Sequence, residues 1–239
     1  MLIEKAYAKV HGNYFTLRGG FANEGMMDLT GCPTECFNFE DDKVQAAIAS
    51  GHLFQKLLQF DEEGFLMSGS TPGEDKFTED RDEGEPDNAD GLVPGHAYSV
   101  IQVKQWKGHR LLNIRNPWGT FEWKGRWADD DRASWTPDVV AAIQPVFGDD
   151  GTFWMCFEDF VQHFRAVNVC KVKDWEEVRV KGEFTNFSHD PNVQSLAPQS
   201  LRSRYFYEIQ VPPTEKKQRI HIGVHLEDLR VQDLAKRRP

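Results

Sequence analysis

Several features are missing from this 239-residue chain, and each absence argues against a class of protein. It has no apolar run of roughly 18 or more residues, so we expect no membrane-spanning helix. Its first residues lack the apolar core and small-residue cleavage site of a secretory signal. A Gly-x-x-x-x-Gly-Lys phosphate loop does not occur. The four cysteines are not tightly spaced, which favours reduced thiols in a cytoplasmic, intracellular protein.

A basic surface is also missing. The formal net charge is -10, and it comes from residues 61–90, which contain 12 acidic and 2 basic side chains. The remaining residues are balanced, with 26 of each sign. Without a basic patch, nucleic acid is not an expected partner. The chain does contain 39% hydrophobic and 12% aromatic residues, which is enough for a packed core in one large or two modest domains.

The hydrophobic pattern predicts both helices and strands. Helices are expected over residues 3–17 (ended by Gly19-Gly20), 42–60, 139–146 and 159–164. Strands are expected over residues 65–67, 97–106, 109–116, 153–157 and 167–172. Tight turns are expected at Lys107-Gly108 and Lys124-Gly125. After Trp175 the pattern becomes all-β, with expected strands over residues 178–180, 205–211 and 220–226.

The acidic segment from Ser68 to Asp90 is rich in Gly, Pro and Asp, and we expect a mobile loop there. One interpretation is a solvated insertion without a function of its own. The other is a gating loop over a substrate cleft, because the segment leads directly into His96 and long loops often act as lids.

Two polar residues flank the expected hairpin: His96 precedes its first strand, and Asn116 ends its second. Antiparallel pairing around Lys107-Gly108 would bring these two residues roughly opposite each other. A thiol protease needs such a pair, because the imidazole takes the thiol proton and the amide oxygen holds the imidazole by its other nitrogen. Trp118 would shield this hydrogen bond from water. The alternatives are a structural histidine, a turn asparagine before Pro117 and a tryptophan in the core.

The motifs together resemble the calpain family of calcium-dependent, papain-like cysteine proteases. They include Gly95-His96-Ala97-Tyr98-Ser99-Val100, Ile114-Arg115-Asn116-Pro117-Trp118-Gly119, Glu4-Lys5-Ala6-Tyr7-Ala8-Lys9, Asp28-Leu29-Thr30-Gly31, Glu122-Trp123-Lys124-Gly125-Arg126-Trp127 and Asp150-Gly151-Thr152-Phe153-Trp154-Met155. The resemblance implies an α+β fold over residues 1–172, the second subdomain of the protease core, with an antiparallel sheet and flanking helices. It implies that residues 173–239 begin a C2-like β-sandwich, present here in part.

In this family the nucleophilic cysteine lies in a Gln-x-x-x-Gly-x-Cys-Trp setting in the other half of the protease core, and no Cys-Trp dipeptide occurs here. Two hypotheses follow. The chain is a fragment, the His/Asn half of a calcium-dependent cysteine endopeptidase, whose partners are protein substrates and the missing Cys-bearing half. Alternatively it is a calpain-like, calcium-responsive binding module without catalysis. On either hypothesis the chain alone is expected to be inactive.

The resemblance also implies a calcium site. Glu122 and Asp129 match acidic ligands in one loop, and Asp150 and the carbonyl of Gly148 match ligand positions in a second loop. Calcium prefers six to eight oxygen ligands, several of them carboxylates. Thr152 departs from the pattern, because the family has a glutamate at its position. The alternative is that these residues form ordinary acidic turns.

Overall fold

The computed structural model describes residues 2–17, 19–73, 90–182, 184–186, 201–203, 207–211, 213, 217 and 219–224. The chain divides into two compact units, Met1–Lys173 with Gly223–Pro239, and Asp174–Ile222. The larger unit carries the residues discussed below, and it has the α+β composition expected from the sequence. Among the helices in these described ranges, none has the length and apolarity needed to cross a membrane.

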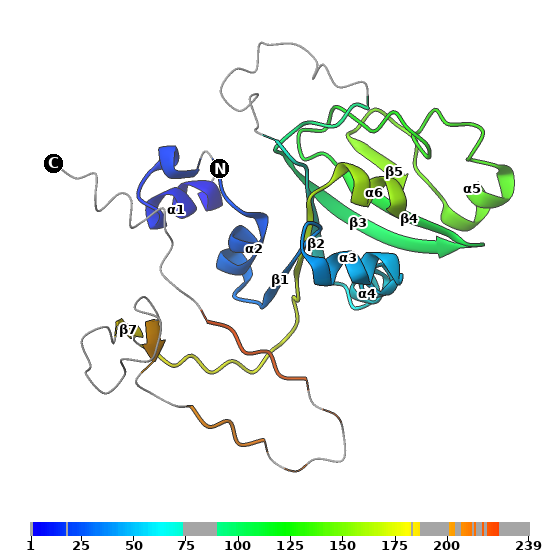
Figure 1. Ribbon diagram of the computed structural model, residues 1–239. Helices are drawn as coiled ribbons and strands as arrows, with labels where there is room; N and C mark the ends of the chain where they lie inside the picture. The colour runs from blue at the N-terminus through cyan, green and yellow to red at the C-terminus, as the bar shows by residue number, and fades with distance from the viewer. Residues whose placement is uncertain are drawn as a thin grey trace. The chain divides into compact units, whose positions relative to one another are not determined.

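A six-stranded antiparallel sheet is the centre of the larger unit (Figure 1). The strand order is β1-β6-β2-β3-β4-β5. The strands are β1 (Thr34–Asn38), β2 (Leu66–Ser70), β3 (Ala97–Trp106), β4 (His109–Arg115), β5 (Thr152–Cys156) and β6 (Ala166–Cys170). The predicted strands of this unit are therefore confirmed, with ends that differ by a few residues, whereas β1 was not expected.

Strands β3 and β4 form the long hairpin visible at the centre of Figure 1. Trp106 pairs with His109, so Lys107 and Gly108 make the turn, as predicted. Both have positive φ values, 44° and 86°, as a two-residue hairpin turn requires. At the other end of the ladder Ser99 pairs with Arg115. The residues that precede β3 and follow β4 therefore meet at the same end of the sheet.

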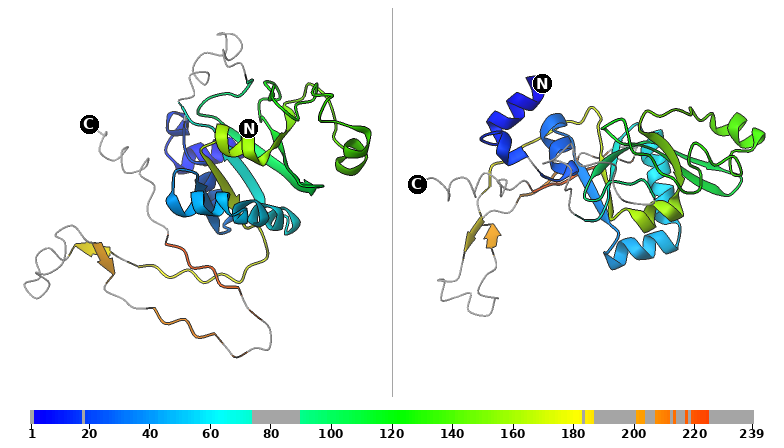
Figure 2. Two further views of the ribbon diagram at one scale, coloured as in Figure 1. Left: turned by 45° about the vertical axis from the view of Figure 1, so that its right-hand side comes forward. Right: turned by 90° about the horizontal axis from the view of Figure 1, so that it is seen from above.

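The sheet buries apolar side chains on both faces. One face packs against α4 (His52–Glu62) and α6 (Phe157–His163), with Leu57 and Phe160 fully buried. The opposite face packs against α5 (Pro137–Ile143) and a cluster that contains Trp127, Trp135 and Trp154. The view from above in Figure 2 shows yellow-green α6 and green α5 on opposite sides of the sheet. Covering both faces makes the sheet a rigid support for the residues at its ends.

The two amino-terminal helix predictions are wrong in their extent. The expected helix over residues 3–17 ends early, as α1 (Leu2–Val10) followed by a short 3₁₀ helix, η1 (Tyr14–Leu17). Between them Gly12 has a φ of 106°, which an α-helix cannot continue. The expected helix over residues 42–60 is divided into α3 (Asp42–Ala49) and α4 because Gly51 is left-handed, with a φ of 77°. Helix α2 (Ala22–Thr30) was not predicted.

The remaining elements of this unit need smaller corrections. Helices α5 and α6 start two residues earlier than predicted and end before the predicted last residue. The turn expected at Lys124-Gly125 lies slightly further on, where the N–H of Ala128 donates to Gly125 O at 3.1 Å, and no strands flank it. The expected loop from Ser68 to Asp90 begins too early, since residues 68–70 belong to β2. Its residues 74–89 lie outside the described residues, so the gating-loop hypothesis stays untested.

The strands expected after Trp175 are not found where the structure describes the chain. Residues 178–180, 207–211 and 220–224 are not strands, while residues 205–206 and 225–226 lie outside the description. Two short strands occur instead, β7 (Phe184–Asn186) and β8 (Leu201–Ser203). The alternating apolar side chains of the expected strands stay exposed, with Ile222 at 77%. Strands need a covered face for stability, and the C2-like architecture is not shown.

Candidate active site

His96 immediately precedes β3, at the end of the sheet opposite the hairpin turn. Its backbone N–H donates to Thr71 Oγ1 at 2.9 Å, and its carbonyl accepts from the N–H of Thr71 at 3.0 Å. Before it, Gly95 has a φ of 63°, and its N–H donates to Pro72 O at 2.9 Å. The main chain that carries the imidazole is thus tied to the residues that follow β2.

The side chains of His96 and Asn116 form a hydrogen bond, with 3.0 Å between Nε2 and Oδ1. Asn116 is completely buried. Its Nδ2 donates to Thr120 O at 2.7 Å and to Phe121 O at 3.4 Å, so the amide oxygen must be the atom that faces the ring. Because that oxygen can only accept, Nε2 of His96 is the nitrogen that donates in this hydrogen bond.

Local sequence explains how Asn116 is held. Its Oδ1 also accepts from the N–H of Trp118 at 3.1 Å, the hydrogen bond of an Asx turn. Its main-chain N–H donates to Gly151 O at 2.7 Å, and its carbonyl accepts from Gly119 N at 3.0 Å. Gly119 has a φ of 75°, which allows this turn. The carboxamide therefore cannot shift to follow a displaced imidazole.

Two aromatic rings enclose the imidazole. Trp118 lies against it with 4.3 Å between ring centroids, and Tyr98 contacts it edge-on at 5.1 Å. His96 is 9% exposed, while Trp118 is 39% exposed. The tryptophan ring therefore contacts the imidazole while remaining partly exposed itself. A hydrogen bond protected from water is stronger because the local dielectric constant is low.

The four cysteines, all within the described residues, lie away from His96. Cys156 and Cys170 pair with Leu111 and Leu66, at the end of the sheet remote from His96. Cys36 is on β1, an edge strand three positions from β3. With ~4.8 Å between strands and ~3.3 Å per residue, each of these thiols is roughly 13 Å or more from the histidine end. Cys32 precedes β1 near the level of Cys170.

The environments of the thiols also oppose nucleophilic chemistry. Burial and a hydrogen bond to Asp159 raise the pKa of Cys156 to about 12. Burial likewise raises the pKa of Cys36 and of Cys170. A reactive cysteine needs a lowered pKa, because the thiolate is the nucleophile. These three thiols lie away from His96, and their raised pKa values disfavour the thiolate.

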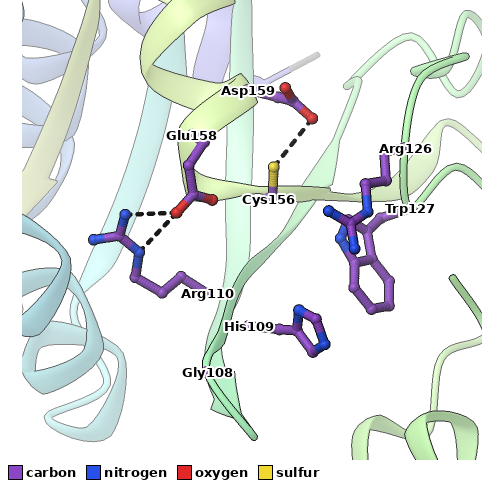
Figure 3. Close-up of a pocket in the computed structure, with 8 residues that line it drawn as sticks. All are labelled: Gly108, His109, Arg110, Arg126, Trp127, Cys156, Glu158 and Asp159. Carbon is purple, nitrogen blue, oxygen red and sulfur yellow. Dashed lines mark hydrogen bonds and ion pairs between the residues drawn. The ribbon is translucent and has the colours of Figure 1, made fainter.

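A polar hollow of about 350 Å³ lies at the opposite end of β4 and β5 (Figure 3). Arg110 and Glu158 form an ion pair at its edge, with 2.9 Å between Nε and Oε1, and the Cys156 thiol donates to Asp159 at 3.1 Å. It is lined by Gly108, His109, Arg110, Arg126, Trp127, Cys156, Glu158 and Asp159. The His96–Asn116 pair is not part of this hollow.

The structure brings the two predicted calcium loops into contact. Glu122 Oε1 accepts from the N–H of Asp150 at 3.0 Å and from that of Gly151 at 2.7 Å. Asp129 Oδ2 accepts from the N–H of Gly148 at 2.9 Å. The Gly148 carbonyl accepts from Asp150 N at 3.0 Å, so it closes a turn. The carboxylates thus hold the loops together through main-chain N–H groups.

The charges in these loops repel one another. Burial raises the pKa of Glu122, and the charges of Asp129 and Asp149 raise it further, against the hydrogen bonds from the second loop. Burial also raises the pKa of Asp129, with contributions from Asp150 and Asp130, and the hydrogen bond from Gly148 opposes these effects. Neighbouring carboxylates disfavour each other's ionisation.

Thr152 affects Asp150, whose pKa is lowered, unlike the pKa values of Glu122 and Asp129. Its side-chain hydrogen bond, and then its N–H at 2.9 Å, lower the pKa of Asp150. One oxygen of Asp129, Oδ1, is buried and has no hydrogen-bond partner among the residues that the structure describes. Oxygen donors and an unpartnered buried carboxylate oxygen suit a divalent cation. Even so, within the ranges that the structure describes, no three His, Cys, Asp or Glu side chains converge as metal ligands, so a calcium site is not shown.

Two residues near His96 were not singled out from the sequence. Thr71 lies in the segment expected to be a loop, yet it is 3% exposed and hydrogen-bonded to both the N–H and the carbonyl of His96. Tyr98 belongs to a motif that gives it no role by itself, and its hydroxyl accepts from the N–H of Val93 at 2.8 Å. Sequence offers little signal for Thr71, because its partner lies 25 residues away.

A buried imidazole that is hydrogen-bonded to a carboxamide is the arrangement that acid–base chemistry in a thiol protease requires. Comparison with known families agrees, since the family described as "Calpain family cysteine protease" matches residues 1–171. The chain belongs to this family.

Similar proteins occur in plants and animals. The chain is 40% identical over 191 residues to the calpain-type cysteine protease DEK1 of Arabidopsis thaliana. The aligned region covers 78% of this chain and 8% of that protein. It is 38% identical over 177 residues to human calpain-9, covering 72% of this chain and 24% of the relative. It is 38% identical over 176 residues to the rat calpain-1 catalytic subunit, covering 72% and 23%. The chain thus spans about a quarter or less of these relatives.

Proposed function

We propose that this chain is the His/Asn half of a cysteine-type endopeptidase, with His96 as general base and acid, Asn116 as its orienting residue and Trp118 as its shield. The hydrogen bond between His96 Nε2 and Asn116 Oδ1 is the observation that carries the proposal. It supports a ring whose Nδ1 can accept a thiol proton while the opposite nitrogen stays fixed. The nucleophile would come from the Cys-bearing half of the protease core.

The proposed reaction follows from these roles. Nδ1 of His96 takes the proton from the supplied cysteine, and the thiolate attacks a peptide carbonyl. When the C–N bond breaks, the leaving amine takes that proton from Nδ1, and an acyl-thioester remains. Water then loses a proton to Nδ1 and attacks the thioester carbonyl. The C–S bond breaks, the carboxylic acid product leaves, and the thiolate takes the proton back from Nδ1. Asn116 stabilises the imidazolium that forms in each half of the cycle, because its oxygen faces the ring.

Reconstitution tests the proposal directly. The chain would be combined with a calpain half that contains the Gln-x-x-x-Gly-x-Cys-Trp segment, and cleavage of an unfolded protein would be followed at millimolar calcium. We expect turnover with both halves, none with either alone, and none with His96→Ala. Cys156→Ser is the matched control, because its thiol lies at the remote end of β5, and it should keep full activity. Activity of the chain alone that disappears in Cys156→Ser would refute the assignment.

Calcium dependence is a second part of the proposal. The support is chemical: Glu122, Asp129 and Asp150 lie in two touching loops, and the buried Asp129 Oδ1 has no hydrogen-bond partner in the described part of the chain. Gly148 would contribute its carbonyl if the turn opened. The threonine at position 152 supplies one carboxylate fewer than the family pattern, so the site should be weaker than the family's.

Calorimetric titration with calcium tests this part. We expect one ion per chain, lost in Glu122→Gln and in Asp129→Asn. Asp138→Asn is the control, because that carboxylate is exposed on α5 and pairs with Lys107 instead. A flat titration of the unaltered chain at high protein concentration would exclude the site, and so would equal binding by all variants.

The second candidate function is a non-catalytic, calpain-like binding module. It is favoured by one observation: all four thiols are described, and they lie far from His96. If reconstitution with an intact Cys-bearing half gave a folded complex without turnover, this alternative would replace the enzyme. An intracellular location and protein substrates belong to the same proposal, and the four free cysteines support the reducing compartment.

A further inference from the structure

Thr71, the first residue after β2, connects to the catalytic candidate through both its main chain and its side chain. Its N–H donates to His96 O at 3.0 Å, which extends the β2–β3 ladder by one residue beyond the pair Ser70 and Ala97. Its Oγ1 accepts from His96 N at 2.9 Å. The two polar main-chain groups of His96 are therefore both held by one residue.

The same hydroxyl holds the turn before His96. Thr71 Oγ1 donates to Val93 O at 2.7 Å, with His96 O as a second acceptor at 3.1 Å. From the other side, the hydroxyl of Tyr98 accepts a hydrogen bond from the N–H of Val93 at 2.8 Å. The ring of Tyr98 contacts the imidazole edge-on. Residues 93–96 are thus fixed between the end of β2 and the start of β3.

The imidazole depends on this turn because its partner cannot move. The carboxamide of Asn116 is held by Thr120 O and by the N–H of Trp118. The bond from His96 Nε2 is 3.0 Å long, and hydrogen bonds weaken steeply beyond about 3.5 Å. A displacement of roughly half an ångström in the main chain of His96 would therefore weaken it and release the ring.

We propose that Thr71 is a positioning residue for His96, and that its hydroxyl fixes the direction and hence the tautomer of the imidazole. Only the importance of Thr71 for catalysis rests on the proposed function. The structural part stands on the four hydrogen bonds between Thr71 and residues 93–96.

Two substitutions separate the hydroxyl from the shape of the side chain. Thr71→Val keeps the volume but leaves the buried N–H of His96 without an acceptor. Thr71→Ser keeps the hydroxyl and loses only a methyl group. Ser68→Ala is the control. Ser68 lies on β2, the strand that leads to Thr71, and its buried Oγ has no hydrogen-bond partner within the described part of the chain.

The measurement is NMR of the full chain with ¹⁵N-labelled histidine, at a pH where imidazole is neutral. In the unaltered chain, Thr71→Ser and Ser68→Ala, we expect His96 to show one tautomer with the proton on Nε2. Thr71→Val should show averaged ring nitrogen shifts, and amide exchange at His96 should be about fivefold faster or more. A folded Thr71→Val with unchanged ring shifts would overturn the inference.

The outcome stays decisive if Thr71→Val does not fold. Thr71→Ser must then reproduce the ring shifts of the unaltered chain, and a different tautomer in Thr71→Ser would overturn the role of the hydroxyl. The ring readout needs no cysteine, so it is independent of turnover. Absent turnover after reconstitution would remove the proposed function, while the tautomer comparison would still decide the role of Thr71.

Discussion

Replacing Asn116 with alanine tests the central geometry most severely. Asn116 is fully buried and uses both ends of its amide. Three of its side-chain hydrogen bonds are 3.1 Å or shorter, to His96 Nε2, to the N–H of Trp118 and to Thr120 O. Alanine removes all three, and it leaves polar groups at the end of the sheet that must find water.

The expected loss can be estimated from these contacts. Each hydrogen bond contributes about 1 kcal/mol net, and an unsatisfied buried partner costs about 1–3 kcal/mol. Partial exposure of Trp118, at 39%, lets water reach some of these groups, so the lower end applies. We therefore expect Asn116→Ala to lower the free energy of unfolding by about 3–4 kcal/mol. That is a large part of the roughly 5–15 kcal/mol typical of a domain.

Urea unfolding followed by tryptophan fluorescence measures this loss. Asn113→Ala is the matched control, because Asn113 lies on β4 and its buried Oδ1 has no hydrogen-bond partner within the described ranges. We expect the control to lose less than about 1 kcal/mol. Equal losses in the two variants, or a loss below about 1 kcal/mol for Asn116→Ala, would show that the amide network does not hold the site as described.

Three further predictions concern other parts of the same unit. Gly151→Ala should cost about 3 kcal/mol of unfolding free energy, because Gly151 has a φ of 83° and a Cβ there would lie 2.8 Å from a backbone atom. Gly148→Ala, with open space around it, should change thermal unfolding little, and equal effects would contradict the reasoning. Because burial raises the pKa of Glu122, its contribution to stability is greatest below its reference value of 4.5 and is lost as the pH rises through the raised value. As the pH is raised from 4.5 to 7.5, the urea midpoint of the unaltered chain should therefore decrease relative to that of Glu122→Gln. An increase in this difference would refute the sign. Since burial and then Asp159 raise the pKa of Cys156 to about 12, alkylation of this thiol by iodoacetamide at pH 8 should be roughly 1000-fold slower than for an ordinary thiol and faster in Asp159→Asn. Peptide mass spectrometry that shows rapid labelling at Cys156 in the folded chain would contradict the prediction.

Local patterns in the sequence predicted the hairpin well. Alternating burial along β3 and the turn at Lys107-Gly108 depend on neighbours within a few residues. A register shift between Val100 and Gln102 was not predicted, and it lets Val100 and Val103, three residues apart, face the same core. This register shift is a β-bulge that adds one residue to β3. The sequence therefore placed His96 and Asn116 near each other but did not fix which residues pair between them and the turn.

The errors share a physical cause. Continuous helices were expected over residues 3–17 and 42–60, because Gly12 and Gly51 interrupt no hydrophobic period. Their positive φ values are set where the chain must turn to pack, and tertiary contacts decide this. Strand β1 was missed since its short segment has no clear alternation, and it is stabilised by β6, more than 120 residues further along the chain.

The sequence by itself determined that His96, Asn116 and Trp118 lie near one another, since they occur in local motifs joined by one hairpin. The tertiary structure decided how the imidazole is held, because Thr71 meets it across two strands separated by the acidic segment. It also decided that the four thiols lie elsewhere, since the order of strands in a sheet depends on packing over the whole unit. Periodicity and turn chemistry act over a few residues, whereas burial selects partners from any distance along the chain.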